Sequence, residues 1–382
     1  MSFAGALALA GSTAPAQTDS TSFANAALSP ELVALLRMLP KWSTSTALAT
    51  SYGYKDNLLL SFVGEERSAF VRGGVELMLL RVPRGQFDYS LYAEAERTHY
   101  FSAKTADHDA KIRVRTEPGY RFGDTLKVAL PLTGYYYDQV FDVSDTDVER
   151  LIARLKVKGV MAGPLVRWDF HPGWWIEGQA IGQKKRYDDG ANDGRIGEGN
   201  VRLGWKPGDR FDIRVSGAQR WRDFERRSQY SSSGRELAGT ELKISEREGE
   251  IRFDVTLDKA GCWNTTTRAS LLRYRDNGSG YFNYREQKVA HEVEWRSEPW
   301  LVRIGGSAGR LDFGVQKVGI GIDPRPSRLK DEFTADLHLE RQISKRWSIF
   351  GSYVWERDRS NDEFASYRLN EGLLGMRWSW EK

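Results

Sequence analysis

The segments WSIFGSYVWERDR (residues 347–359) and LLGMRWSW (residues 373–380) alternate between apolar and polar side chains and carry tryptophan near their ends. In the first segment Trp347, Ile349 and Tyr353 fall on one face, because successive side chains of an extended strand point to opposite faces. An apolar face with an aromatic residue at each end is typical of a strand in a transmembrane β-barrel. The two segments therefore predict a barrel hairpin whose apolar face contacts lipid.

The same alternation continues from Thr46 to the C-terminus, and turn residues separate the segments. Short turns alternate with long polar loops, as they do at the periplasmic and extracellular ends of outer-membrane barrels. We predict an all-β fold, a closed antiparallel transmembrane β-barrel of about 16 strands that is preceded by a short N-terminal helix. The predicted short turns lie at 84–85, 123–124, 172–173, 207–208, 259–261, 297–299 and 344–346, and the predicted long loops at 57–66, 101–108, 139–148, 187–195, 223–240, 275–280, 312–328 and 357–363.

Charged residues occupy positions that would face the lumen, whereas the lipid-facing positions stay apolar. For example, Phe211 and Val215 alternate with Asp212 and Arg214. An arginine or lysine on the lipid face near the membrane midplane would cost about 2–4 kcal/mol, so the sorting has a large energetic effect. The apolar positions change parity around Pro164, where we predict a β-bulge.

The composition excludes several other classes of protein. Charged residues make up 28% of the chain and the mean hydropathy is −0.55, so no run of about 18 apolar residues can form a membrane-spanning helix. The net charge of +4 gives no signal for nucleic-acid binding. The single cysteine, Cys262, excludes intramolecular disulfides. The rival folds are a soluble β-sandwich, whose strands would be shorter, and a propeller, whose blades would repeat a motif.

Three regions are predicted along the chain. Residues 1–17 resemble the end of a secretory signal peptide, with a small-residue apolar stretch followed by APA at residues 14–16. Residues 18–44 contain SPEL at 29–32, a helix start with proline in the first turn, and predict a short helix in the periplasm or the lumen. Residues 45–382 are predicted to form the outer-membrane barrel.

The inward positions predict a lumen with two walls of opposite charge. In a 16-strand barrel, strands four to six lie across the lumen from strands twelve to fourteen. A basic wall that faces an acidic wall sets up a transverse field, which orients dipolar or zwitterionic solutes. The alternative interpretation is that these charges pair with neighbouring residues and only keep the channel hydrated. The predicted pore-lining basic residues are Lys111, Arg113, Arg115, Lys127, Arg154, Lys156 and Arg214, and the predicted acidic ones are Glu292, Glu294, Glu332, Asp336 and Glu340.

Other chemistries have less support. Most tryptophans lie near predicted strand ends and would form the interfacial girdles, whereas Tyr92, Trp175 and Phe350 point inward and offer faces on which sugar rings could stack. The five histidines are scattered, and neither a GxSxG nor an HExxH motif occurs. The sequence therefore predicts no catalytic residue, no metal site and no cofactor. An outer-membrane hydrolase is the least supported alternative.

Residues near both ends of the chain resemble a known family. GYKDN at residues 53–57 is similar to the GYDDN signature that opens the outer-membrane β-barrel porins often encoded beside exopolysaccharide and exosortase systems. YVWERDRSND at residues 353–362, followed by Tyr367 and Asn370, is similar to the last hairpin of that family, and also to the barrel of surface-lipoprotein assembly modifiers. The final Glu-Lys pair departs from the aromatic C-terminus that is usual for insertion signals. The resemblance implies an outer-membrane barrel.

These patterns predict a porin-like channel, not an enzyme, in the outer membrane of a Gram-negative-type envelope. Small polar or charged solutes would pass through its charged lumen. The alternative is the barrel component of an export or assembly system for exopolysaccharide or surface lipoproteins. The expected partners are outer-membrane lipid and, during insertion, the barrel assembly machinery. No nucleic-acid partner is expected, and the sequence leaves open whether the barrels form homo-oligomers.

Overall fold

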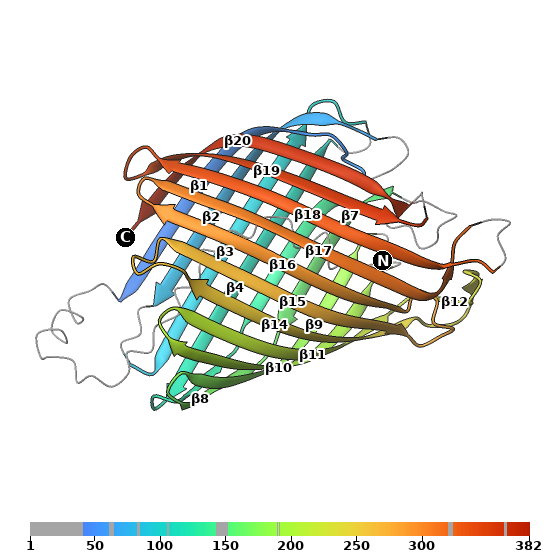
Figure 1. Ribbon diagram of the computed structural model, residues 1–382, viewed down its shortest axis with the longest axis horizontal. Coiled ribbons are helices and arrows are strands. Elements are labelled where there is room, and N and C mark those ends of the chain that lie inside the picture. The colour runs from blue at the N-terminus through green and yellow to red at the C-terminus, as the bar shows by residue number, and fades with distance from the viewer. Residues whose placement is uncertain are drawn as a thin grey trace, which may run out of the picture.

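Antiparallel strands join edge to edge into a closed barrel in the computed structural model (Figure 1). The first strand, β1 (Trp42–Lys55), pairs with β2 (Ser68–Arg81) on one side and with the last strand, β20 (Tyr367–Glu381), on the other. This double pairing closes the sheet into a cylinder. The structure describes residues 41–60, 65–81, 85–104, 107–142, 152–188, 190, 192–319, 324–362 and 365–382.

Sixteen strands form the wall, because two of them are each interrupted once by proline. Pro131 separates β5 (Leu126–Ala129) from β6 (Leu132–Asp142), and Pro164 separates β7 (Ile152–Ala162) from β8 (Leu165–His171). Proline lacks the N–H group that a sheet ladder requires. The predicted all-β class and strand number are confirmed. The other wall strands are β3 (Phe87–Tyr100), β4 (His108–Phe122), β9 (Trp174–Tyr187), β10 (Gly194–Gly208), β11 (Phe211–Phe224), β14 (Lys243–Thr256), β15 (Trp263–Asp276), β16 (Tyr284–Ser297), β17 (Trp300–Lys317), β18 (Ser327–Gln342) and β19 (Trp347–Ser360), while β12 (Gln229–Tyr230) and β13 (Glu236–Leu237) form a separate hairpin.

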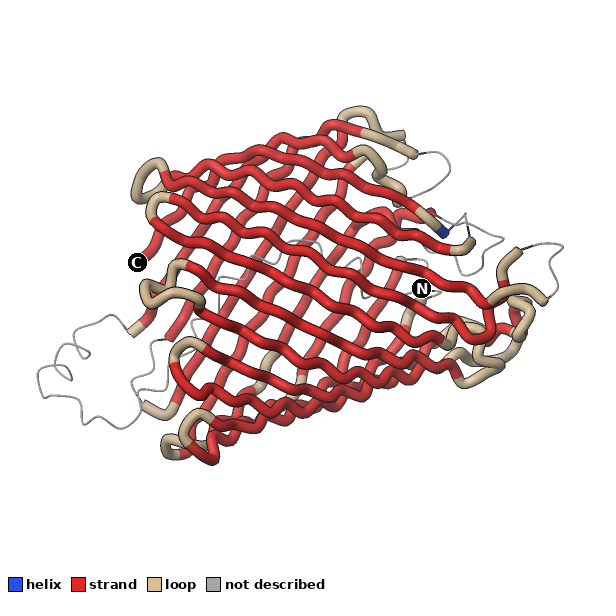
Figure 2. The backbone as a smooth tube through the Cα atoms, viewed as in Figure 1, coloured by secondary structure: helices blue, strands red, loops and turns tan. Residues whose placement is uncertain are grey.

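Short turns connect the strands at one end of the barrel, and longer loops connect them at the other (Figure 2). The turn after β4 has Gly123 at φ 64°, and the turn after β8 has Gly173 at φ 77°, a backbone conformation that favours glycine. Between β14 and β15, the backbone N–H groups of Trp263 and Cys262 donate hydrogen bonds to Asp258 and lower the pKa of its carboxyl group. The described connections overlap the predicted ones, but β17 extends to Lys317 and β19 to Ser360, into segments that the sequence predicts as loops.

The outward-facing side chains form an apolar exterior. The strand register puts Leu374, Leu271 and Val160 on the outer face, and Leu374 is 75% exposed. Near the short turns, Trp174 stacks on Trp205 across neighbouring strands with ring centroids 5.3 Å apart. A closed antiparallel barrel with an apolar exterior and aromatic girdles is the architecture of outer-membrane proteins, so the chain resides in that membrane. Among the described residues, no helix is long and apolar enough to cross a membrane.

The strand made of β7 and β8 departs from the predicted pattern. The sequence predicts a bulge at Pro164, but the register with β9 is the same on both sides of this residue. Ala162 pairs with Gly182, and Leu165 pairs with Gln179. The bulge prediction is wrong, because the proline interrupts the ladder without inserting an unpaired residue. The apolar positions change parity along this strand because the inward side chains of β7 are mostly apolar and several of its outward side chains are basic.

Side chains as well as backbone join the first strand to the last. The carboxylate of Asp56 accepts hydrogen bonds from the backbone N and the side-chain Nδ2 of Asn370, at 2.7 and 2.5 Å. Asn57 is buried, and its Nδ2 donates to a backbone carbonyl of β20 at 2.9 Å. Gly53 makes room for the Phe70 ring, because a Cβ at Gly53 would lie 2.5 Å from Cζ of that ring. Family-like residues at the two chain ends therefore meet at the barrel closure.

The N-terminal boundary of the barrel lies slightly before the predicted one. β1 begins at Trp42, whereas the sequence predicts the barrel from residue 45. The predicted signal-peptide segment, residues 1–17, and the predicted short helix within residues 18–44 lie outside the described residues.

Candidate functional site: the charged inner face

The inner face of the barrel carries ionisable side chains that remain open to water. The strand register can be followed around the closed barrel, and it assigns alternate residues of each strand to the inner face. On this face Glu292, Glu96, Arg202 and Arg115 have side chains that are 50%, 45%, 42% and 41% exposed. Charged side chains are costly to bury without compensation, so this exposure inside a closed wall fits a water-filled lumen.

Three of the predicted basic pore-lining residues lie on the inner face of β4. Nζ of Lys111 is 3.0 Å from Oε1 of Glu94 on the neighbouring β3. Nη2 of Arg115 is 2.9 Å from Oε2 of Glu117, two residues further along β4. Arg113 lies between them and forms no ion pair within the described residues. The basic side of the lumen is therefore partly neutralised by its own neighbours.

The functional residues that sequence reasoning missed are carboxylates of β3, which pair with basic residues of β4 and β5. Nζ of Lys127, on the inner face of β5, lies 3.3 Å from Asp88 of β3 and 3.4 Å from Glu117. Asp88 and Glu94 both occupy inward positions of β3. The two-residue alternation of the sequence could therefore have predicted that both carboxylates face the lumen. The pairs themselves depend on which residues of β3 and β4 stand opposite each other. That register is a property of the folded sheet.

Arg154 and Lys156 lie on the outer face, so their prediction as pore-lining residues is wrong. Leu155 and Val157, which alternate with them along β7, face inward and are buried. Nε of Arg154 is 2.7 Å from Oδ1 of Asp138 on β6. Near the loops, outward positions have left the hydrocarbon region, and a basic residue there costs little. The usual sorting of charge to the inside therefore fails at this end of β7.

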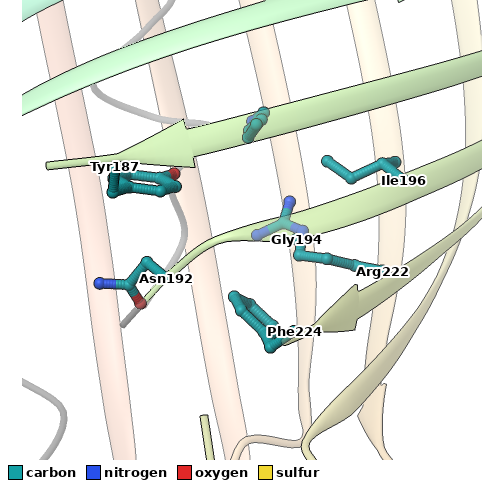
Figure 3. A pocket seen from close by; sticks show the side chains of 7 residues that line it. Tyr187, Asn192, Gly194, Ile196, Arg222 and Phe224 are labelled. Carbon is teal, nitrogen blue, oxygen red and sulfur yellow. The ribbon is translucent and has the colours of Figure 1, made fainter. Parts of the chain in front are cut away.

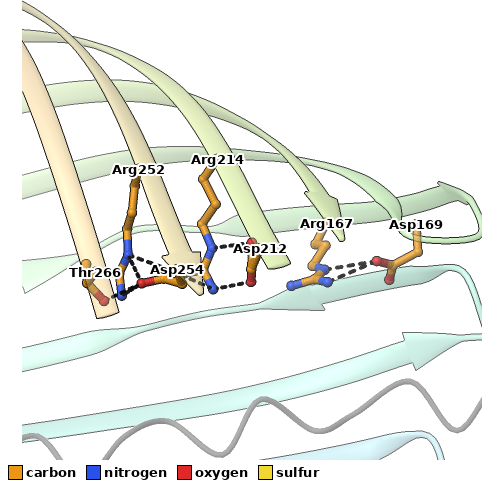
Figure 4. Close-up of polar contacts among 7 residues, drawn as sticks. All are labelled: Arg167, Asp169, Asp212, Arg214, Arg252, Asp254 and Thr266. Atoms are coloured by element: carbon orange, nitrogen blue, oxygen red, sulfur yellow. Dashed lines mark hydrogen bonds and ion pairs between the residues drawn. The ribbon is translucent and has the colours of Figure 1, made fainter. Parts of the chain in front are cut away.

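Near the short turns, arginine and aspartate residues pair along single strands (Figure 4). Nη2 of Arg214 lies 2.5 Å from Oδ2 of Asp212 on β11, and Nε of Arg252 lies 2.8 Å from Oδ2 of Asp254 on β14. The hydroxyl of Thr266 on β15 donates to Oδ1 of Asp254 at 2.6 Å. Residues that are two positions apart on a strand point to the same face, so both members of each pair project into the lumen. The structure thus places Arg214 on the inner face with its charge compensated.

These pairs belong to a lateral row of arginines on the inner face. Arg214 stands directly opposite Arg252, and Arg252 stands opposite Arg268 on β15. Like charges at directly opposite positions of a sheet repel each other. Asp212 and Asp254 offset two of the charges, whereas Arg268 is exposed and forms no ion pair in the described part of the chain. We call these three residues the inner arginine row.

The predicted acidic residues face inward on β16 and β18, and most of them have a basic partner. Oε2 of Glu294 is 2.6 Å from Nη2 of Arg303 on β17, and Glu292 is 3.8 Å from the same guanidinium. Asp336 forms no ion pair among the described residues. Pairing within this wall, as within the basic one, weakens the transverse field that the sequence predicts. Glu332 pairs with Lys330 at 3.0 Å, and Glu340 lies 3.5 Å from His338, whose imidazole carries a positive charge only when it is protonated.

A cluster of apolar side chains covers part of the inner face beneath the loops. Inward residues such as Phe224 and Phe313 pack there with Phe282 from the loop between β15 and β16. The guanidinium of Arg227, in the loop after β11, lies over the rings of Phe224 and Phe282, 5.3 and 5.2 Å from their centroids. These loops therefore fold over the inner face and narrow the mouth on that side. The small pocket beside the cluster is lined by Lys185, Tyr187, Asn192, Gly194, Ile196, Arg222 and Phe224 (Figure 3).

No family model matches the chain, and no curated protein sequence matches it. Solved structures similar to the barrel include OccAB3 of Acinetobacter baumannii, with 8% identity and a TM-score of 0.47 over 89% of this chain and 99% of that one. OmpT of Vibrio cholerae has 10% identity and a TM-score of 0.45 over 90% and 99%. The outer membrane protein opdK of Pseudomonas aeruginosa has 10% identity and a TM-score of 0.44 over 88% and 99%. At these levels the likeness assigns neither a family nor a solute.

Proposed function

We propose that the chain is an outer-membrane channel, without enzymatic activity, through which small polar or charged solutes diffuse. The observation that supports this function is the water exposure of inward charged side chains, such as Glu292 and Arg202, inside a closed wall. Barrels with sixteen or more strands leave an aqueous channel. Within the described residues, no group of three or more His, Cys, Asp or Glu side chains is arranged to hold a metal ion.

The proposed lumen selects solutes by their charge pattern more than by net charge. The inner arginine row offers a positive element on β11, β14 and β15, where only Arg268 is without a carboxylate partner among the described residues. Asp336 on β18 offers an uncompensated negative element on the acidic side. A lumen with separate positive and negative elements orients a small solute that carries both an anionic and a cationic group. Zwitterionic solutes are therefore the class that we assign to this lumen.

A role in exopolysaccharide or surface-lipoprotein export is the second candidate, and it rests on the family resemblance alone. Several residues that carry this resemblance, Gly53, Asp56, Asn57 and Asn370, lie at the contact between the first and last strands. Their local role in barrel closure gives no information about a substrate. Co-purification of a periplasmic partner with the full-length chain would favour export over passive diffusion.

Bilayer recordings of the purified full-length chain are expected to show stepwise conductance. Asp212→Asn combined with Asp254→Asn leaves Arg214 and Arg252 without their carboxylates, so the reversal potential in a salt gradient should move toward anion selectivity. Asp223→Asn combined with Asp331→Asn removes the same charge from the outer face and should leave the reversal potential unchanged. A wild-type chain that stays silent at all voltages would contradict the proposed function.

A further inference from the structure

A second row of arginines lies on the outer face of the barrel, near the loops. Arg247 on β14 stands directly opposite Arg273 on β15, and Arg273 stands opposite Arg285 on β16. All three are exposed, and none forms an ion pair within the described residues. Nε of Arg247 donates one hydrogen bond to Oε1 of Gln219 at 2.7 Å. We call these three residues the outer arginine row.

The height of the outer arginine row matches the top of the hydrocarbon region. Trp263 lies ten residues before Arg273 on β15, and Trp295 lies ten residues after Arg285 on β16. Ten strand residues rise about 33 Å, and a strand tilt of about 40° reduces this to about 25 Å, the height of the apolar band of such barrels. The exposed Leu271 lies on the same face directly below Arg273. The loop end is extracellular, so the row faces the headgroups of the outer leaflet.

The same arrangement recurs around the barrel. On β19 and β20, residues ten positions from the turn-side tryptophans Trp347 and Trp378 are again arginines, and they stand opposite each other. Basic residues also stand opposite one another on the outer face of β7, β9 and β10. The recurrence fits a surrounding layer of negative charge better than it fits one local contact. The opposed pairs are Arg357 with Arg368, Lys158 with Arg186, and Lys184 with Arg195.

Opposed like charges need a counter-anion. Cross-strand pairs of equal charge destabilise a sheet, and the nearest opposed carboxylate, Asp312, stands only at the end of the outer arginine row beside Arg285. Guanidinium groups bind phosphate through paired hydrogen bonds, and the apolar surface below the row suits acyl chains. We propose that the outer arginine row binds the phosphate groups of a phosphorylated glycolipid in the outer leaflet. This lipid site is independent of whether the lumen conducts.

The test compares two triple variants of the full-length chain in detergent micelles. The row variant is Arg247→Gln with Arg273→Gln and Arg285→Gln. The control variant removes the same charge at the opposite end of the barrel, in short turns that face the periplasm. The probe is bis-phosphorylated lipid A, and binding is counted by native mass spectrometry over a lipid titration. The control substitutions are Arg210→Gln, Lys259→Gln and Arg346→Gln.

The wild-type chain and the control variant are expected to bind the lipid with equal apparent Kd, whereas the row variant should bind at least tenfold more weakly. Binding by the wild-type chain should weaken as salt is added, because salt screens exposed charges. Dephosphorylated lipid A should bind the wild-type chain and the row variant with the same apparent Kd. Without lipid, the row variant should melt at the same temperature as the wild type or higher, since removing opposed charges relieves repulsion.

Equal lipid binding by the wild-type chain and the row variant would overturn the proposal. Inorganic phosphate provides the second decisive comparison, because it carries the anionic group without acyl chains. If inorganic phosphate raised the melting temperature of the wild-type chain as much as lipid A does at equal phosphate concentration, the site would be an anion site and not a lipid site. We expect inorganic phosphate to have a much smaller effect.

Discussion

Val215→Arg is expected to lower the free energy of unfolding of the barrel by about 2–4 kcal/mol, because it places a charge on the lipid face. Val215 is exposed on the outer face of β11, midway between the girdle at Phe211 and the loop end. The next residue, Ser216, faces the lumen, where it stands opposite Glu250. Ser216→Arg should therefore change the free energy of unfolding by less than about 0.5 kcal/mol.

Urea titration of both variants in phospholipid vesicles measures this difference. The two substitutions share the strand, the added side chain and the added charge, and they differ in the face of the sheet and in the side chain that is replaced. Equal destabilisation by Val215→Arg and Ser216→Arg would mean that the two faces of β11 meet the same environment. That result would contradict the assignment of an outer lipid face.

Gly53→Val is expected to destabilise the barrel closure by about 3 kcal/mol through overpacking. A Cβ at Gly53 would lie 2.5 Å from Cζ of Phe70 and 2.6 Å from the carbonyl oxygen of Gly372. Backbone on β20 cannot move away without opening the contact between the first and last strands. The expected result is a lower urea midpoint and a smaller yield of the heat-resistant folded form on electrophoresis.

Gly73→Val is the matched control for this closure. Gly73 lies on the neighbouring β2, faces outward, and would have no heavy atom within 4 Å of an added Cβ. A β-branched residue suits an open strand position, so this variant should be as stable as the wild type or slightly more stable. If Gly73→Val were as harmful as Gly53→Val, the effect would come from losing glycine and not from crowding at the closure.

The sequence predicted the strands and their faces because lipid and water impose a two-residue period on a barrel wall. Leu374 and Met376 stay apolar on the outer face, while the predicted acidic residue Glu340 faces inward. The connections were predicted for a related reason, since glycine at positive φ is needed in turns such as that at Gly123. Both signals are local, so neither depends on knowledge of the neighbouring strands.

Contacts between strands could not be predicted in the same way. The pairing of Lys111 with Glu94 depends on the register of β3 against β4. Arg154 was assigned to the wrong face because alternation carries no penalty for outward charge once a strand has left the hydrocarbon region. The apolar cluster beneath the loops, which includes Phe282, depends on long-range folding of loops whose sequences show no periodicity.

The partition of alternate side chains between lipid and a water-filled lumen can be measured directly along β11. In a Cys262→Ser background, single cysteines at positions 212 to 217 would each carry a spin label in phospholipid vesicles. The account predicts that labels at 213, 215 and 217 collide mainly with oxygen dissolved in lipid, and labels at 212, 214 and 216 mainly with a water-soluble nickel chelate. Collision rates without this two-residue period would contradict a barrel with lipid outside and water inside.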